Sequence, residues 1–200
     1  MPLGSARATS VFVNTPFDSS YQRQFIALLA AIIAIGRTPR CVLEVAEVGL
    51  GRLTRLLDLM SDCEVSIHDL SRVGLPSRFN MPFELGLACA VAELRPPHAF
   101  ILLEKIPYRM QVTLSDMNGR DPYIHNGTIR GVIDSVLNAL RPTAGAPTGA
   151  EVFRLYGTMR IAAESITTHG RNGSIFTRSR FLDLVAVGVE RAAQTGLIAR

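Results

Sequence analysis

Strand-like and helix-like segments alternate through the first 140 residues of the chain. Ser10–Asn14 reads as a strand, Tyr21–Gly36 as a strongly apolar helix ended by glycine, and Ala99–Leu103 as a continuous apolar strand. A continuous apolar run is typical of a parallel strand buried on both faces. Alternation at this spacing predicts an α/β fold built on a doubly wound parallel sheet.

The other expected elements follow the same two patterns. Strands are expected at Cys41–Leu43, Val65–His68 and Gln111–Leu114, and helices at Arg52–Met60, from Asn80 onward, and at Thr128–Leu140, Ala150–Thr168 and Arg178–Thr195. The helix Arg52–Met60 is expected to bury Leu53, Leu56, Leu57 and Met60. Residues 44–51 and 115–126 read as loops.

A Pro/Gly/Ala/Thr stretch, Pro142–Gly149, reads as a linker. It divides the chain into an α/β domain, residues 1–141, and a C-terminal helical extension, residues 150–200. The two helices of the extension must bury an apolar face, and either the domain's own core or a second subunit can cover it. We expect a homo-oligomer.

Composition narrows the class of partner. The net charge of +4 comes mostly from arginine, which suits phosphate or carboxylate ligands, but no basic block is long enough for a nucleic-acid groove. The three cysteines have neither CxxC nor Cys/His spacing, so no disulfide framework or zinc site is expected. The longest apolar run, Phe25–Ile35, is shorter than the roughly 20 residues of a membrane span. We expect a cytoplasmic protein with no membrane or nucleic-acid partner.

Motifs that are missing narrow the chemistry. The loop after the first strand, TPFDSS, has no glycine, which argues against a dinucleotide-binding turn and a dehydrogenase. The chain also lacks GxxxxGK[ST] and GxSxG, the signatures of P-loop NTPases and of α/β-hydrolases. Chemistry performed by carboxylates, without a cofactor or metal, is what remains.

The segment from Asp62 to Ala90 carries the candidate site. Asp69, Ser71 and Arg72 follow the strand Val65–His68, at the edge where open α/β sheets bind ligands. Asn80 is a good N-cap for the next helix, and Glu84 lies in that helix's first turn, where the helix dipole favours a carboxylate. The pattern predicts that both carboxylates converge on one crevice.

Two carboxylates in a crevice can cleave the bond between a ribose and a base. Such cleavage passes through a sugar cation, which Glu84 could stabilise or capture, while Asp69 could bind sugar hydroxyls or protonate the departing base. Each residue also has a structural alternative, since a first-turn Glu complements the helix dipole and an Asp after a strand makes turns.

The strand-end Asp69 with the helix motif ELGLA resembles the D…E-x-G-x-A pattern of the nucleoside 2-deoxyribosyltransferase superfamily. Over about the first 125 residues, the motifs VNTPFD, IHDLSR, NMPFELG and SDMNGRD also resemble a group of uncharacterised bacterial proteins. The resemblance implies a flavodoxin-like fold, related to that of NAD-cleaving TIR domains, and a nucleotide-binding domain. It implies that Glu84 is the catalytic glutamate, that Asp69 contacts the sugar or base, and that Phe17 or Tyr21 lies near the base.

The matched motifs also supply expected substrate-binding residues, namely Asn14, Asp18, Ser71 and Asn80. The chain departs from the transferases at Arg52, His68 and Arg72, which suit a phosphorylated ligand. Two of the three have an alternative: His68 can be a proton donor or a structural histidine, and Arg52 can pair with Glu44 or Glu47.

A second polar cluster contains Asp116, Asp121 and His125, which read either as a lid or metal contact or as an Asx-rich turn. The leading expectation is an enzyme that cleaves the base–ribose bond of NAD or a nucleoside monophosphate, with bacterial defence as a possible setting. The first rival is a non-catalytic nucleotide sensor. The second is a Mg²⁺-dependent nuclease or phosphohydrolase using Asp18, Asp69, Glu84 and Asp116.

Overall fold

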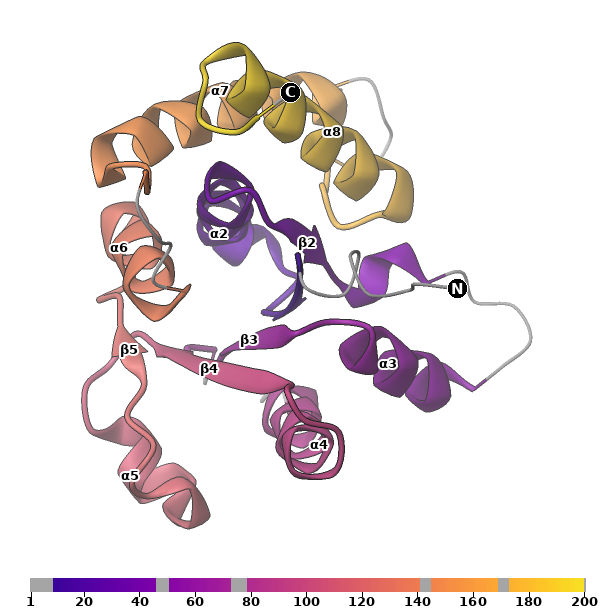
Figure 1. Cartoon of the computed structure of the whole chain (residues 1–200), viewed down its shortest axis with the longest axis vertical. Helices are drawn as coiled ribbons and strands as arrows, with labels where there is room; N and C mark the ends of the chain where they lie inside the picture. The colour runs from indigo at the N-terminus through magenta and orange to yellow at the C-terminus, as the bar shows by residue number, and fades with distance from the viewer. Residues whose placement is uncertain (1–8, 46–50, 73–78, 141–144, 169–172, 200) are drawn as a thin grey trace.

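One five-stranded parallel sheet, in the order β2-β1-β3-β4-β5, forms the centre of the molecule (Figure 1). The computed structural model describes residues 9–45, 51–72, 79–140, 145–168 and 173–199. This strand order is that of flavodoxin-like folds, so the expected fold class is confirmed. The strands are β1 (Ser10–Asn14), β2 (Thr38–Arg40), β3 (Val65–Asp69), β4 (Ala99–Glu104) and β5 (Tyr123–Ile124). The α-helices are α2 (Gln22–Ala34), α3 (Arg52–Ser61), α4 (Asn80–Leu94), α5 (Arg109–Thr113), α6 (Ile129–Leu140), α7 (Gly149–Thr168) and α8 (Arg178–Gln194), and the 3₁₀ turns are η1 (Ser19–Tyr21), η2 (Val42–Glu44) and η3 (Ser115–Met117).

The alternation of side chains along the strands assigns each residue to one face of the sheet. Val11, Val13 and Ile67 belong to the main core, which contains α2, α6, α7 and α8. Phe12 lies on the other face and packs with Leu56 of α3 and Ala88 of α4. The odd-numbered positions of β1 and β3 therefore face α2, and the even-numbered positions face α3 and α4.

Helix α2 is buried on all sides. Every residue from Phe25 to Ala34 is at most 1% exposed, as expected for a helix that is apolar all round. The sheet covers one side of α2, and α6, α7 and α8 cover the others (Figure 1). The C-terminal helices thus form a third layer that shares the core of the α/β domain. This packing favours the expectation that their apolar face is covered by the domain's own core. The homo-oligomer stays a prediction.

Two predicted strands are wrong. Cys41–Leu43 is not a strand, because β2 ends at Arg40 and the chain then turns through η2, where Glu44 accepts hydrogen bonds from Arg40 and from the Cys41 amide. Gln111–Leu114 belongs mostly to the short helix α5. The fifth strand, β5, lies inside the predicted polar loop; its two residues are too few to show periodicity.

Two details of the helices also differ from expectation. Leu53 of α3 is 47% exposed, and Leu59 takes its place among the buried residues. Asn80 is the first residue of α4 and not its N-cap, which is Phe79. As a result Glu84 is the fifth residue of α4 and lies in its second turn, so its predicted place in the first turn is wrong. Residues 46–50 of the predicted loop and 142–144 of the predicted linker lie outside the described residues. Among the helices described, none is both long and apolar enough to cross a membrane.

Candidate functional site

The carboxyl ends of β1 and β3 meet at the point where the strand order reverses. Helix α2, which follows β1, covers one face of the sheet, and α4, which follows β3, covers the other. Ligands of open α/β sheets bind at such a switch point. Asn14 and His68 are neighbours across this pair of strands, and Asp69 ends β3.

Asp69 lies on the α2 side and is fully buried. The Tyr21 hydroxyl donates a hydrogen bond to its Oδ2, and the Ser71 amide donates to its Oδ1 at 2.9 Å. His125, which directly follows β5, places its Nε2 3.2 Å from Asp69 Oδ2 and 2.8 Å from Ser71 Oγ. This Asp69 network joins the ends of β3 and β5 to the loop after β1.

The hydrogen bonds of His125 fix its tautomer. The Gly127 amide donates to His125 Nδ1 at 3.0 Å, so that nitrogen carries a lone pair and the proton of the neutral ring sits on Nε2. Nε2 therefore donates toward Asp69 and Ser71. It has no lone pair with which to accept the Ser71 proton, so these residues do not form a serine-hydrolase triad.

Gly131 of α6 allows His125 to take this position. A Cβ at residue 131 would lie 2.1 Å from the His125 carbonyl oxygen, a backbone atom that cannot move aside cheaply. We expect Gly131→Ala to lower the free energy of unfolding by about 2–3 kcal/mol, as overpacking does. Gly157→Ala in α7 is the matched control, because a Cβ there meets nothing within 4 Å. That control should be neutral or raise stability by up to about 1 kcal/mol. Urea unfolding of both variants measures the difference, and equal midpoints would show that the backbone yields easily.

Glu84 lies on the opposite face, on the side of α4 that meets α3. Its side chain is 6% exposed, accepts a hydrogen bond from Asn80, and lies near Arg52 at the start of α3. Burial raises the pKa of the Glu84 carboxyl, while Asn80 and Arg52 oppose that shift. Among the described residues, no hydrogen bond or ion pair joins Glu84 to Asp69, so the two carboxylates belong to separate clusters.

Asn14 connects α4 to the switch point. Its Nδ2 lies 3.0 Å from His68 Nδ1 and 3.4 Å from the Met81 carbonyl oxygen, one turn before Glu84. His68 is fully buried, and its Nε2 has no hydrogen-bond partner in the described parts of the chain. Burial, with a smaller contribution from His98, lowers the pKa of His68 to about 3. The ring is therefore neutral at physiological pH and supplies no positive charge for a phosphate.

The neutral burial of His68 predicts how stability depends on pH. Because its pKa is about 3 in the folded chain and near 6.5 when unfolded, the stabilisation is complete above pH 6.5 and is lost as the pH falls toward 3. We expect a loss on the order of 2 kcal/mol between pH 7.5 and pH 5 from this residue. Urea unfolding at the two pH values checks it. The same pH dependence in His68→Asn would contradict the assignment.

The loops after β1 and β3 are joined by an ion pair. Arg72 Nε lies 2.9 Å from Asp18 Oδ2, and the other oxygen of Asp18 accepts from the Ser20 hydroxyl. Phe17 points into an aromatic cluster with Phe25 and Phe176, at centroid distances of 5.8 and 5.4 Å. That packing favours a core role for Phe17, which was one of two residues expected near the base. The other, Tyr21, donates a hydrogen bond from its hydroxyl to Asp69.

Two predicted groupings are not found. The carboxylates suggested for a Mg²⁺ site are dispersed: Asp18 pairs with Arg72, Asp69 and Glu84 belong to different clusters, and Asp116 is exposed on η3. Within the described ranges, no group of three or more His, Cys, Asp or Glu side chains could hold a metal ion. Of the second polar cluster, His125 joins the Asp69 network, whereas Asp116 and Asp121 are exposed.

Sequence reasoning gave no site role to Glu104, although the signal was present. Glu104 ends β4 and is 1% exposed, so it is an acidic residue at the carboxyl end of a buried strand, as Asp69 is. It pairs with Arg109 of α5.

No family model, curated protein or solved structure matches the chain.

Proposed function

We propose that this protein is a nucleotide-binding N-glycosidase that cleaves the base–ribose bond of NAD or a nucleoside monophosphate. The observation that supports the proposal is the Glu84 carboxylate, buried in the second turn of α4 and three residues after Met81, whose carbonyl oxygen lies 3.4 Å from Asn14 Nδ2 at the switch point. Burial makes a carboxylate more basic and leaves it poorly solvated, and both effects strengthen its interaction with a sugar cation. Asn80 donates a hydrogen bond to the carboxylate, and the positive charge of Arg52 is close enough to favour its ionised form.

The arginines have different availability for a phosphate. Arg52 is exposed at the start of α3, next to Glu84, and is our choice for the phosphate contact. Arg72 is paired with Asp18 and would have to exchange that partner. Asp69 is surrounded by three donors of the protein, the Tyr21 hydroxyl, the Ser71 amide and His125 Nε2. We therefore assign Asp69 the role of positioning the loop that carries Ser71.

The test is to incubate the pure protein with NAD, nucleoside monophosphates and deoxynucleosides in EDTA and to detect free base by chromatography. We expect release from phosphorylated substrates, because a carboxylate-stabilised sugar cation needs no metal. Binding without release would instead support a nucleotide sensor. Activity that appears only after Mg²⁺ is added would support metal-dependent chemistry and contradict the proposal.

A further inference from the structure

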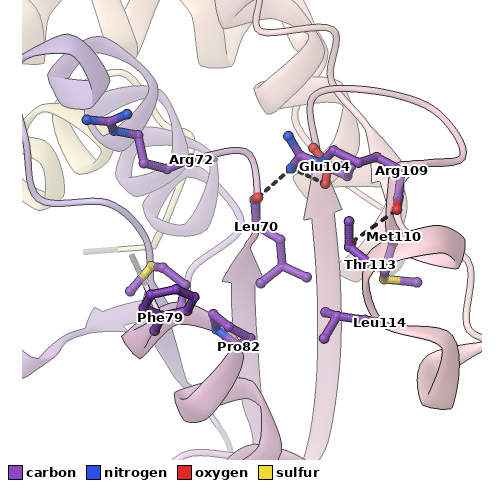
Figure 2. A pocket seen from close by; sticks show the side chains of 10 residues that line it. Leu70, Arg72, Phe79, Pro82, Glu104, Arg109, Met110, Thr113 and Leu114 are labelled. Carbon is purple, nitrogen blue, oxygen red and sulfur yellow. Dashed lines mark hydrogen bonds and ion pairs between the residues drawn. The ribbon is translucent and has the colours of Figure 1, made fainter. Parts of the chain in front are cut away.

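A pocket separate from Glu84 opens between α4 and α5. It has a volume of about 280 Å³ and lies at the carboxyl ends of β3 and β4. Figure 2 shows Leu70, Phe79 and Pro82 on one side of it, Met110, Thr113 and Leu114 on the other, and Glu104 with Arg109 at one end. Glu84 lies on the flank of α4 that meets α3, whereas Phe79 and Pro82 of this pocket lie on the flank that meets α5.

The walls of the pocket are mainly apolar, and apolar side chains are exposed around it. Phe79 lines the pocket and is 79% exposed, and Ile106, Tyr108 and Val112, from α5 and the turn before it, are also exposed. Tyr108 has a φ of 62°, a left-handed conformation that a non-glycine residue seldom adopts. Two methionines, Met81 and Met110, line the pocket, and thioethers pack well against aromatic rings. These walls suit a small planar aromatic body.

Three charged side chains line the pocket: Arg72, which is paired with Asp18, and Glu104 and Arg109, which form its polar end. That end offers one donor and one acceptor. Arg109 Nη2 donates to Glu104 Oε2 and to the Leu70 carbonyl oxygen, but its buried Nη1 has no partner in the part of the chain that the structure describes. Glu104 Oε1 accepts from the amides of Lys105 and Ile106, whereas within the described residues Oε2 accepts only from Arg109, so Oε2 has room for a second donor. An unpaired guanidinium nitrogen in a buried position is costly, and a ligand acceptor would relieve that cost.

We infer that this pocket binds a small planar aromatic molecule that carries an amide edge, either a primary carboxamide or a ring lactam. The ligand's carbonyl accepts from Arg109 Nη1, and its N–H donates to Glu104 Oε2. The ring packs against Phe79, Met81 and Met110. An amide matches both protein groups, whereas a carboxylate would meet the Glu104 charge and an amine would meet Arg109.

Three probes that differ only in their head group test the inference on the full chain. Ligand-observed NMR at millimolar concentration should detect benzamide and give at least about tenfold weaker binding for benzoate and benzylamine, because each leaves a buried group unpaired or faces a like charge. Benzoate or benzylamine binding as tightly as benzamide would overturn the ligand class. No binding of any probe would overturn the site.

Two substitutions on α5 then place the probe. Thr113→Trp puts a bulky ring at an exposed residue that lines the pocket, and Val112→Trp puts the same ring on a neighbour that is 84% exposed and does not line it. We expect Thr113→Trp to weaken benzamide binding at least about tenfold and Val112→Trp to leave it unchanged. Glu84→Gln should also leave it unchanged. Binding that survives Thr113→Trp, or that is lost in Glu84→Gln, would place the probe elsewhere and overturn the inference whether or not the glycosidase proposal holds.

Discussion

A chain that ends after Leu140 is expected to be insoluble or molten, although it keeps all five strands. Removing α7 and α8 uncovers the side of α2 that packs against Leu155, Met159 and Leu184. Those residues of α2 are apolar and at most 1% exposed, and each large apolar side chain returned to water costs roughly 1.5–3 kcal/mol. Several such losses together are comparable to the roughly 5–15 kcal/mol by which domains are usually stable. Near-ultraviolet circular dichroism and dye binding to exposed apolar surface measure the outcome.

A full-length variant tests the same interface without deleting any of the chain. Gly188 of α8 approaches α2 and α7 so closely that a Cβ there would lie 2.8 Å from Ile33 Cδ1 and 2.9 Å from Met159 Sδ. Gly188→Leu should therefore be destabilising, while Gly157→Ala, with open space around it, should not be. A soluble, cooperatively unfolding fragment that ends after Leu140 would show instead that the C-terminal helices are a separable extension.

The sequence pattern was sufficient where the apolar period was long enough to measure. Strand β1 has the predicted bounds, and β4 differs from its prediction by one residue, because continuous apolar runs, VFV in β1 and AFILL in β4, are typical of buried strands. The helix α6 likewise begins one residue after its predicted start. β2 and β5 could not be predicted, because strands of three and two residues are too short for an alternating pattern to stand out. They exist through pairing with β1 and β4.

The candidate site was harder to predict because neighbouring residues in a strand point to opposite faces. His68 and Asp69 are adjacent in sequence, but His68 meets Asn14 on the α4 side and Asp69 meets Tyr21 on the α2 side. The sequence pattern correctly puts His68 and Asp69 at the carboxyl end of one strand. It does not show that Asp69 faces α2, whereas Glu84 belongs to α4 on the other face of the sheet. The partners in the Asp69 network come from distant parts of the sequence: Tyr21 precedes Asp69 by 48 positions, and His125 follows Ser71 by 54. Sequence periodicity carries no information about contacts over such separations.

Glu84→Gln is expected to reduce base release by at least about 100-fold while the protein remains folded. The change keeps the size of the side chain and its hydrogen bond with Asn80 but removes the charge that the proposal requires to meet the sugar cation. Chromatographic detection of free base gives the turnover, and equilibrium binding of the substrate should change by only a few fold. Glu93→Gln, on an exposed position of the same helix, is the matched control and should keep wild-type turnover.

The stability of the Glu84→Gln variant separates a catalytic role from a structural one. Burial raises the pKa of Glu84 in the folded protein, so its contribution to stability is present below the unfolded pKa and is lost as the pH rises through the folded value. Once the carboxyl is ionised in the folded protein, its charge is a cost, so the neutral glutamine should leave the chain at least as stable as the wild type. If Glu84→Gln is at least as stable as the wild type but loses most of its turnover, Glu84 serves function at the expense of stability, as active-site residues often do. Loss of stability without loss of turnover would instead make Glu84 a structural residue that packs between α4 and α3, and would remove the basis of the glycosidase proposal.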